Sequence, residues 1–130
     1  MKPLAREWVE KAEGDFATAR RELRARKQPN FDAACFHAQQ CAEKYLKALL
    51  QETGQRIPRS HDLDSIAKPL LESYSTLSTL RTAFRTLSAY AVESRYPGRD
   101  STRSLAREAV LIATRIRSAA RAALRLKDRD

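Results

Sequence analysis

The sequence has little of the residues that most often carry metal binding or phosphate cradles. Its 130 residues include two cysteines, two histidines and three glycines, and the glycines stand apart from one another. Isolated glycines exclude a glycine-rich phosphate loop, and two cysteines with two histidines give no zinc-finger spacing. We therefore expect no metal site and no cofactor.

Long hydrophobic runs are also missing. No apolar run exceeds five residues, whereas a helix that crosses a membrane needs about 20, and the first residues lack the apolar segment of a signal peptide. Cys35 and Cys41 are six residues apart in one expected helix, about 9 Å along its axis, which is too far for a disulfide. Free thiols are typical of a reducing compartment, so we expect a cytoplasmic protein with no membrane contact.

The scarcity of turn residues indicates an all-α protein. Three glycines and five prolines are too few for a sandwich or barrel, which turns every ten residues or so. Apolar residues recur at helical spacing and predict helices over residues 3–25, 31–53, 62–71, 74–92 and 102–127. We expect one helical domain over residues 1–130, an up-and-down antiparallel bundle of four to five helices.

Helix boundaries follow from polar residues that cap free backbone N–H groups. We expect Asn30 to cap the second helix, Ser60 or Asp62 the third and Ser101 the last, and Gly54 to end the second helix. The apolar stripe of the first helix is expected to contain Leu4, Trp8, Ala12, Phe16, Ala19 and Leu23.

Positive charge predominates, with 25 Lys and Arg against 16 Asp and Glu, and it is concentrated near the C-terminus. On a helical projection, five arginines of the last helix form one ridge opposite its apolar face. Because the guanidinium group pairs bidentately with phosphate, this ridge predicts a nucleic-acid surface, although a solvated face that keeps the protein soluble is an equal interpretation. The ridge consists of Arg103, Arg107, Arg117, Arg121 and Arg125.

A polar ridge also follows the second helix. His37, Gln40 and Lys44 stand at positions i, i+3 and i+7, so they share one face. Imidazole, amide and ammonium groups all donate hydrogen bonds to anions. We predict that these three residues and Arg95 line a groove for a nucleotide or phosphate.

Several of these residues belong to a recognisable pattern. Trp8-x-x-Lys11-Ala12-x-x-Asp15 opens the first helix, and the second holds Phe36-His37-x-Gln39-Gln40-x-x-Glu43-Lys44. His61-Asp62-Leu63 follows, and Arg95-Tyr96-Pro97 closes the fourth helix. This combination resembles the HEPN domain, the higher-eukaryote and prokaryote nucleotide-binding domain, over about residues 5–126. The resemblance implies a dimeric helical bundle that partners a minimal nucleotidyltransferase, often as a toxin–antitoxin pair.

Catalysis is the point on which interpretations divide. Many HEPN proteins cut RNA without a metal, using an arginine followed after four to six residues by a histidine. The corresponding stretch after Arg95 contains no histidine, whereas Arg56 and His61 match the spacing from the loop before the third helix. We expect His61 to help Ser60 and Asp62 cap that helix instead.

Three functions therefore remain open. The first is a dimeric, nucleotide- or RNA-associated subunit without its own catalysis, whose two-fold interface includes Phe36, Tyr90 and Tyr96. The second is a metal-independent endoribonuclease toxin that uses Arg56 and His61. The third is a non-catalytic RNA-binding module that uses the C-terminal arginine ridge.

Overall fold

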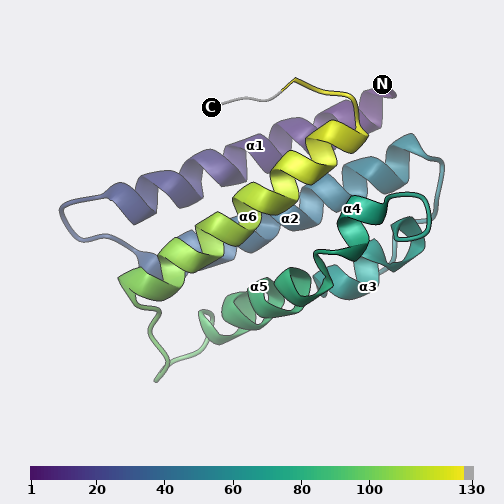
Figure 1. Ribbon diagram of the computed structural model, residues 1–130. Coiled ribbons are helices and arrows are strands. Elements are labelled where there is room, and N and C mark those ends of the chain that lie inside the picture. Colours follow the sequence, from purple (N-terminus) through teal and green to yellow (C-terminus); the bar gives the residue numbers. More distant parts are fainter. Residues whose placement is uncertain (128–130) are drawn as a thin grey trace.

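The protein is a bundle of helices, as the sequence predicts. A computed structural model describes residues 1–127, which contain helices and no strand (Figure 1). In chain order, the elements are α1 (Pro3–Arg24), α2 (Phe31–Glu52), α3 (Leu63–Ala67), the 3-10 turn η1 (Lys68–Leu70), α4 (Ser75–Ser78), α5 (Arg81–Glu93) and α6 (Arg103–Ala123).

The longest helices, α1 and α2, run antiparallel and pack along most of their length. Ala5, Ala12 and Ala19 of α1 are completely buried and recur every seven residues, so they lie along one side of the helix. Small side chains at this spacing let the two backbones approach closely. The pair provides the frame on which the other helices pack.

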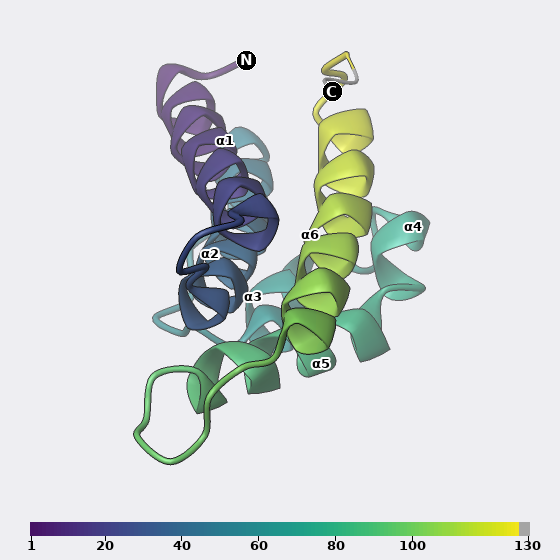
Figure 2. The same ribbon diagram turned by 90° about the vertical axis from the view of Figure 1, so that its left-hand side faces the viewer.

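The central element is α2. It contacts α1, α6, α5 and α3, and more than half of its residues are buried. In Figure 1, α6 crosses in front of α2, with α1 above and α5 below. Viewed from the side, α6 stands beside the α1–α2 pair and above α5 (Figure 2). Two polar residues of α2, Gln39 and Glu43, are therefore buried between α2 and its neighbours.

Two of the predicted caps are confirmed and one is wrong. The Asn30 side chain accepts a hydrogen bond from Ala33 N at 2.9 Å, and Asp62 accepts one from Ser65 N at 3.0 Å. Thr102, not Ser101, caps α6, by accepting from Leu105 N at 3.1 Å. Ser101 instead donates its backbone N–H to Asp32 at 2.8 Å, which fixes the loop before α6 to the start of α2.

The predicted helix over residues 74–92 is interrupted. It consists of α4 and α5, separated by Thr79 and Leu80. The Thr79 hydroxyl donates to the Thr76 carbonyl at 2.7 Å, a local bond that competes with continued helix. Leu77 and Leu80 are both buried, so the bend turns two leucines into the core.

Helix ends depend on residues in the left-handed region of backbone space. Gly54 ends α2 as predicted, with φ of 71°, a conformation that glycine adopts without strain. Arg125 has φ of 60°, so α6 ends at Ala123 and not at residue 127. The predicted stripe of α1 also shifts, because Leu4 is 55% exposed while Ala5 and Val9 are buried.

The remaining sequence expectations concern cysteines, membranes and metals. Cys35 and Cys41 are both free and buried. None of the helices within residues 1–127 is long and apolar enough to cross a membrane. The same part of the chain contains no group of three or more His, Cys, Asp and Glu side chains placed to hold a metal ion.

Candidate phosphate-binding cleft

A buried amide and a buried carboxylate lie side by side on α2. Gln39 and Glu43 are one turn apart and almost fully buried, and Gln39 Nε2 donates to Glu43 Oε1 at 3.1 Å. The same nitrogen donates to the backbone carbonyl of His61 at 2.8 Å. Gln39 therefore holds the loop before α3 against the middle of α2.

His61 connects this buried pair to solvent. Its Nδ1 lies 3.1 Å from Glu43 Oε1 and 3.2 Å from Oε2, while 73% of its side chain is exposed, against 3% for Glu43. Lys47 Nζ donates to Glu43 Oε2 at 2.8 Å. The carboxylate thus orients an imidazole whose other nitrogen, Nε2, makes no hydrogen bond within residues 1–127.

The environment of Glu43 keeps it ionised. Burial by itself raises a carboxyl pKa, but hydrogen bonds from Lys47, Gln39 and His61 and the Lys47 charge outweigh burial and lower the pKa of Glu43 below its ordinary value of 4.5. A carboxylate that stays charged at neutral pH fixes the ring orientation of its histidine partner, as in other carboxylate–histidine pairs.

An open cleft of about 460 Å³ lies beside His61, between the 61–62 loop, α2 and α5. Two arginines of the α5 region, Arg85 and Arg95, line it together with His61. The rest of the lining consists of two carboxylates, two further polar residues and three apolar ones: Asp62, Glu93, Gln39, Ser88, Ala89, Ala91 and Val92. The Ser88 hydroxyl accepts a hydrogen bond from Leu63 N at 3.0 Å, so it fixes one wall. Guanidinium groups at the rim of a small cleft are suited to phosphate, which they bind through charge-assisted hydrogen bonds.

The two arginines are held differently. The Arg95 guanidinium lies 4.7 Å from the centre of the Phe36 ring, a cation–π contact that positions it without neutralising its charge. Arg85 Nε lies 3.5 Å from Asp64 Oδ2. Asp64 is engaged more closely by Arg81, through two hydrogen bonds of 3.0 Å each. Both cleft arginines therefore retain donors for a ligand.

The four residues predicted to line one groove lie in two places. His37 Nδ1 and Lys44 Nζ both contact Asp15 of α1, at 2.7 and 2.5 Å. Gln40 Nε2 donates to Gln39 Oε1 at 2.9 Å. Arg95 alone of the four lines the cleft, because α1 packs along the side of α2 that presents His37 and Lys44.

The predicted roles of Arg56 and His61 also separate. Arg56 is exposed and is not part of the cleft lining. The expectation that His61 caps α3 is wrong, because Asp62 provides the cap and Ser60 Oγ accepts from Asp62 N at 3.0 Å. The His61 side chain is turned toward Glu43 instead.

The continuous arginine ridge of the last helix is likewise wrong. Arg117 and Arg121 are 6% and 5% exposed, since α6 packs on both α1 and α2 and its buried arc includes them. Arg117 Nε and Nη2 donate to Glu13 at 2.7 and 2.9 Å. Arg121 donates to the Tyr45 hydroxyl at 2.9 Å, and that hydroxyl donates to Glu13.

Only part of the predicted ridge is left at the surface. Arg103, Arg107 and Arg125 are exposed, and Arg125 lies beyond the end of α6. Exposed cations of α6 are therefore concentrated at its beginning, next to the end of α1.

Sequence reasoning missed Arg85, Gln39 and Glu43. Gln39 and Glu43 stand in the pattern that carries the family resemblance, but the projection of a single helix does not reveal that they face a loop 20 residues away. Arg85 has no local signal, since one arginine among 18 is not distinctive.

An all-helical bundle with a histidine and two arginines around an open cleft is the kind of protein that the sequence pattern implies. The model of the HEPN domain matches residues 5–123. The chain therefore belongs to the HEPN domain family.

A solved structure supports the same assignment. The crystal structure of TT1696 from Thermus thermophilus is similar, with a TM-score of 0.79 and 28% sequence identity over 91% of this chain and 96% of that one. No curated protein matches this chain significantly.

Proposed function

We propose that this protein is a HEPN subunit that binds the phosphate group of a nucleotide or an RNA in the cleft beside His61. The observation that carries the proposal is the convergence of His61, Arg85 and Arg95 on one opening of about 460 Å³. Three nitrogen-bearing groups from two parts of the chain supply donors on several sides of an anion.

The same proposal includes the assembly in which the subunit works. It acts as a homodimer, associated with a minimal nucleotidyltransferase in a toxin–antitoxin type system, and it binds without catalysing a reaction. Tyr96 is 63% exposed at the end of the chain segment that leaves α5. Phe36 lies under Arg95, so a dimer contact that includes these rings adjoins the cleft.

The test compares two arginines that share a partner. Arg81 and Arg85 both approach Asp64, but only Arg85 lines the cleft. We expect Arg85→Ala to weaken the binding of labelled ATP about tenfold or more, since a lost charge-assisted hydrogen bond costs about 1.5–3 kcal/mol, and Arg81→Ala to bind as the wild type does. Equal losses in the two variants, or no binding of ATP and short RNA by the wild type, would contradict the proposal.

One observation favours a second function, cleavage of RNA. A histidine whose Nδ1 contacts a buried carboxylate while Nε2 is accessible has the arrangement of a general base. Such a base takes the proton of a 2′-hydroxyl as its oxygen bonds to the adjacent phosphorus. The bond to the 5′-oxygen then breaks, that oxygen takes a proton from water or from the imidazolium, and a 2′,3′-cyclic phosphate is left. Arg85 and Arg95 stabilise the added negative charge on the phosphorane.

A cleavage assay on total RNA distinguishes phosphate binding without catalysis from RNA cleavage. The binding proposal predicts no cleavage by either the wild type or His61→Ala. If the wild type cuts RNA and His61→Ala does not, although both proteins melt at the same temperature, the protein is a ribonuclease and the proposal of binding without catalysis is wrong.

A further inference from the structure

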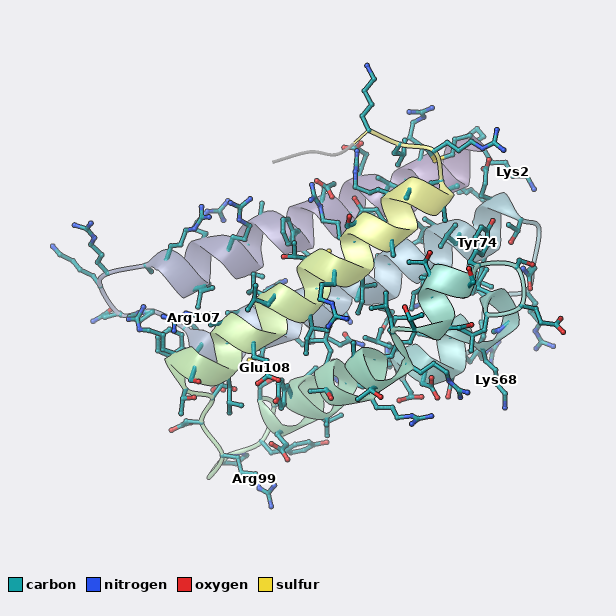
Figure 3. All side chains as sticks on the ribbon, viewed as in Figure 1. Lys2, Lys68, Tyr74, Arg99, Arg107 and Glu108 are labelled. Atoms are coloured by element: carbon teal, nitrogen blue, oxygen red, sulfur yellow. The ribbon has the colours of Figure 1, made fainter. Side chains whose placement is uncertain are left out.

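Seven cations gather where α1 ends and α6 begins. Arg103 joins the two helices, because its Nη1 donates to the Leu23 carbonyl at 3.4 Å. Nitrogen-tipped side chains spread from this end in Figure 3, where Arg107 is labelled, and Lys2 and Lys68 lie at the opposite end. We name as the basic end the residues Arg20, Arg21, Arg24, Arg26, Lys27, Arg103 and Arg107.

The carboxylates next to the basic end make no ion pair with its cations. Glu22 accepts a hydrogen bond from Asn30 N at 3.1 Å, and Asp32 accepts one from Ser101 N at 2.8 Å. Within residues 1–127, none of the seven cations forms an ion pair. Six of the seven are exposed and Arg20 is half-buried.

The stability of the helices explains only part of this charge. Arg21 and Arg24 occupy the last turn of α1, where the helix dipole favours cations. Arg103 occupies the first turn of α6, which contains no acidic residue, and there the dipole disfavours a cation. Arg26 and Lys27 lie beyond α1. Helix stability therefore accounts for Arg21 and Arg24 but not for Arg26, Lys27 and Arg103, and such a surplus of cations is expected where a surface meets an anion.

Two of the arginines are already ordered. The Arg103 guanidinium lies 5.0 Å from the centre of the Phe31 ring, and that of Arg20 lies 5.4 Å from the centre of Phe16. Arg24 follows Arg20 by one turn, and Arg107 follows Arg103 in the same way, about 6 Å along each axis. That interval is similar to the distance between successive phosphates of an extended nucleic-acid strand.

The composition of the basic end favours nucleic acid over a protein partner. Protein interfaces are anchored by buried apolar and aromatic side chains, while nucleic-acid interfaces are more polar and much more positive. None of the exposed large hydrophobic residues lies within residues 20–27 or 103–107, the two segments that form the basic end; they are Met1, Leu4, Val92, Tyr96 and Leu111.

We propose that the basic end binds the phosphate backbone of single-stranded RNA, with little sequence preference, as a surface separate from the cleft. A guanidinium fixed on an aromatic ring presents its outer plane to unpaired bases, which favours a single strand over a duplex. The choice of RNA over DNA rests on the function proposed for the cleft. Binding to a phosphate backbone depends only on the charges and contacts of the basic end.

The experiment measures the affinity for labelled oligouridine at several salt concentrations. Each phosphate contact with a single strand contributes about −0.7 to the slope of log affinity against log salt. The wild type therefore gives a slope near −5 if all seven cations take part. The double variant Arg24→Ala/Arg107→Ala removes two exposed cations that make no ion pair within the described residues. We expect its slope to be shallower by about 1.4. Its melting temperature falls by no more than a few degrees, because the dipole of α1 favours Arg24 only weakly.

Arg6→Ala/Lys68→Ala is the matched control, because it removes the same charge from exposed positions outside the basic end. It keeps the wild-type affinity and slope. Equal losses in both double variants show that only net charge matters and overturn the proposal. So does tighter binding of duplex RNA, or competition by polyglutamate as strong as that by oligouridine, which assigns the surface to an acidic protein.

Binding of ATP separates this proposal from the one for the cleft. We expect the Arg24→Ala/Arg107→Ala variant to bind ATP as tightly as the wild type does, and Arg85→Ala to bind ATP more weakly than either. If no protein binds ATP and Arg85→Ala leaves oligouridine binding unchanged, while that binding still depends on the basic end, the function proposed for the cleft fails and the basic end stands. If the wild type binds ATP and the Arg24→Ala/Arg107→Ala variant binds oligouridine as the wild type does, the proposal for the basic end fails and the function proposed for the cleft stands.

Discussion

Glu13 and Glu43 are both carboxylates inside the bundle, and their surroundings differ in one respect. Glu13 is surrounded by partners that are themselves enclosed, Arg117 and Arg121, whose side chains are 7% and 5% exposed. Glu43 is more deeply buried than Glu13, yet one of its partners, His61, is 73% exposed.

The difference shows what each carboxylate does. The interactions of Glu13 end inside the protein, where they join α1, α2 and α6. Glu43 contacts His61, and His61 is exposed and lines the cleft. A buried charge is costly in either place unless it is paired, but only the second arrangement leaves a nitrogen for a ligand.

The largest effect is expected from opening the enclosed network. Arg117→Ala removes the two hydrogen bonds of 2.7 and 2.9 Å to the largely enclosed Glu13 carboxylate, while Arg121 Nη1 lies 3.8 Å from it. Because a buried charge that loses its partner costs about 3–5 kcal/mol, we expect the free energy of unfolding in urea to fall by that amount. Arg115→Ala, an exposed position on the same helix, changes it by about 0.5 kcal/mol or less. Similar values for the two variants would contradict the structural role of Arg117.

Acid affects both networks in the same direction. Burial raises the pKa of Glu13, but hydrogen bonds from Arg117 and Tyr45 and the charges of Arg117 and Arg121 outweigh burial and lower it; the pKa of Glu43 is also lowered. A carboxyl whose pKa is lower in the folded state stabilises the fold above its ordinary pKa of 4.5. That stabilisation is lost as the pH falls through the lower value.

Urea unfolding at a series of pH values from about 7 to about 3 tests this dependence. We expect the free energy of unfolding of the wild type to decline as the pH falls below about 4.5. Glu43→Gln, which cannot titrate at this position, declines less steeply. A variant that follows the wild-type curve at every pH shows that Glu43 does not contribute to acid sensitivity.

The smallest effect on stability distinguishes two helix caps. Asp62→Ala and Asn30→Ala each remove a side-chain cap, and each costs about 1 kcal/mol, a few degrees in melting temperature. Only Asp62 adjoins His61 and lines the cleft. Asp62→Ala also removes a negative charge from the cleft, which by itself favours ATP. If the cap positions His61, we nevertheless expect Asp62→Ala to weaken ATP binding and Asn30→Ala to leave it unchanged, although both melt earlier. Unchanged ATP binding in Asp62→Ala would show that the cap does not position His61.

The sequence predicts the helices well because their periodicity and caps are local. Asn30, Asp62 and Gly54 act on neighbouring residues, so their roles are visible in the sequence. The interruption between α4 and α5 is decided by where Leu77 and Leu80 meet the core. That contact depends on helices distant in the sequence.

The candidate site is predicted less completely, because it depends on which helix covers which face. His37 and Lys44 share a face with Gln40, as their spacing indicates, but α1 brings Asp15 to that face and occupies them. Arg117 and Arg121 align with Arg103 on a projection of α6. The packing of α6 on two helices then buries the first pair and exposes Arg103.

The two histidines of the chain report directly on the central claim that the cleft binds phosphate. His37 contacts Asp15 on the α1 side of α2, and His61 lines the cleft, so their imidazole signals distinguish the two regions in one NMR spectrum. On titration with ATP at neutral pH, we predict that the ring signals of His61 shift and saturate while those of His37 stay in place. Shifts at His37 with none at His61, or no change at either ring, would contradict the account.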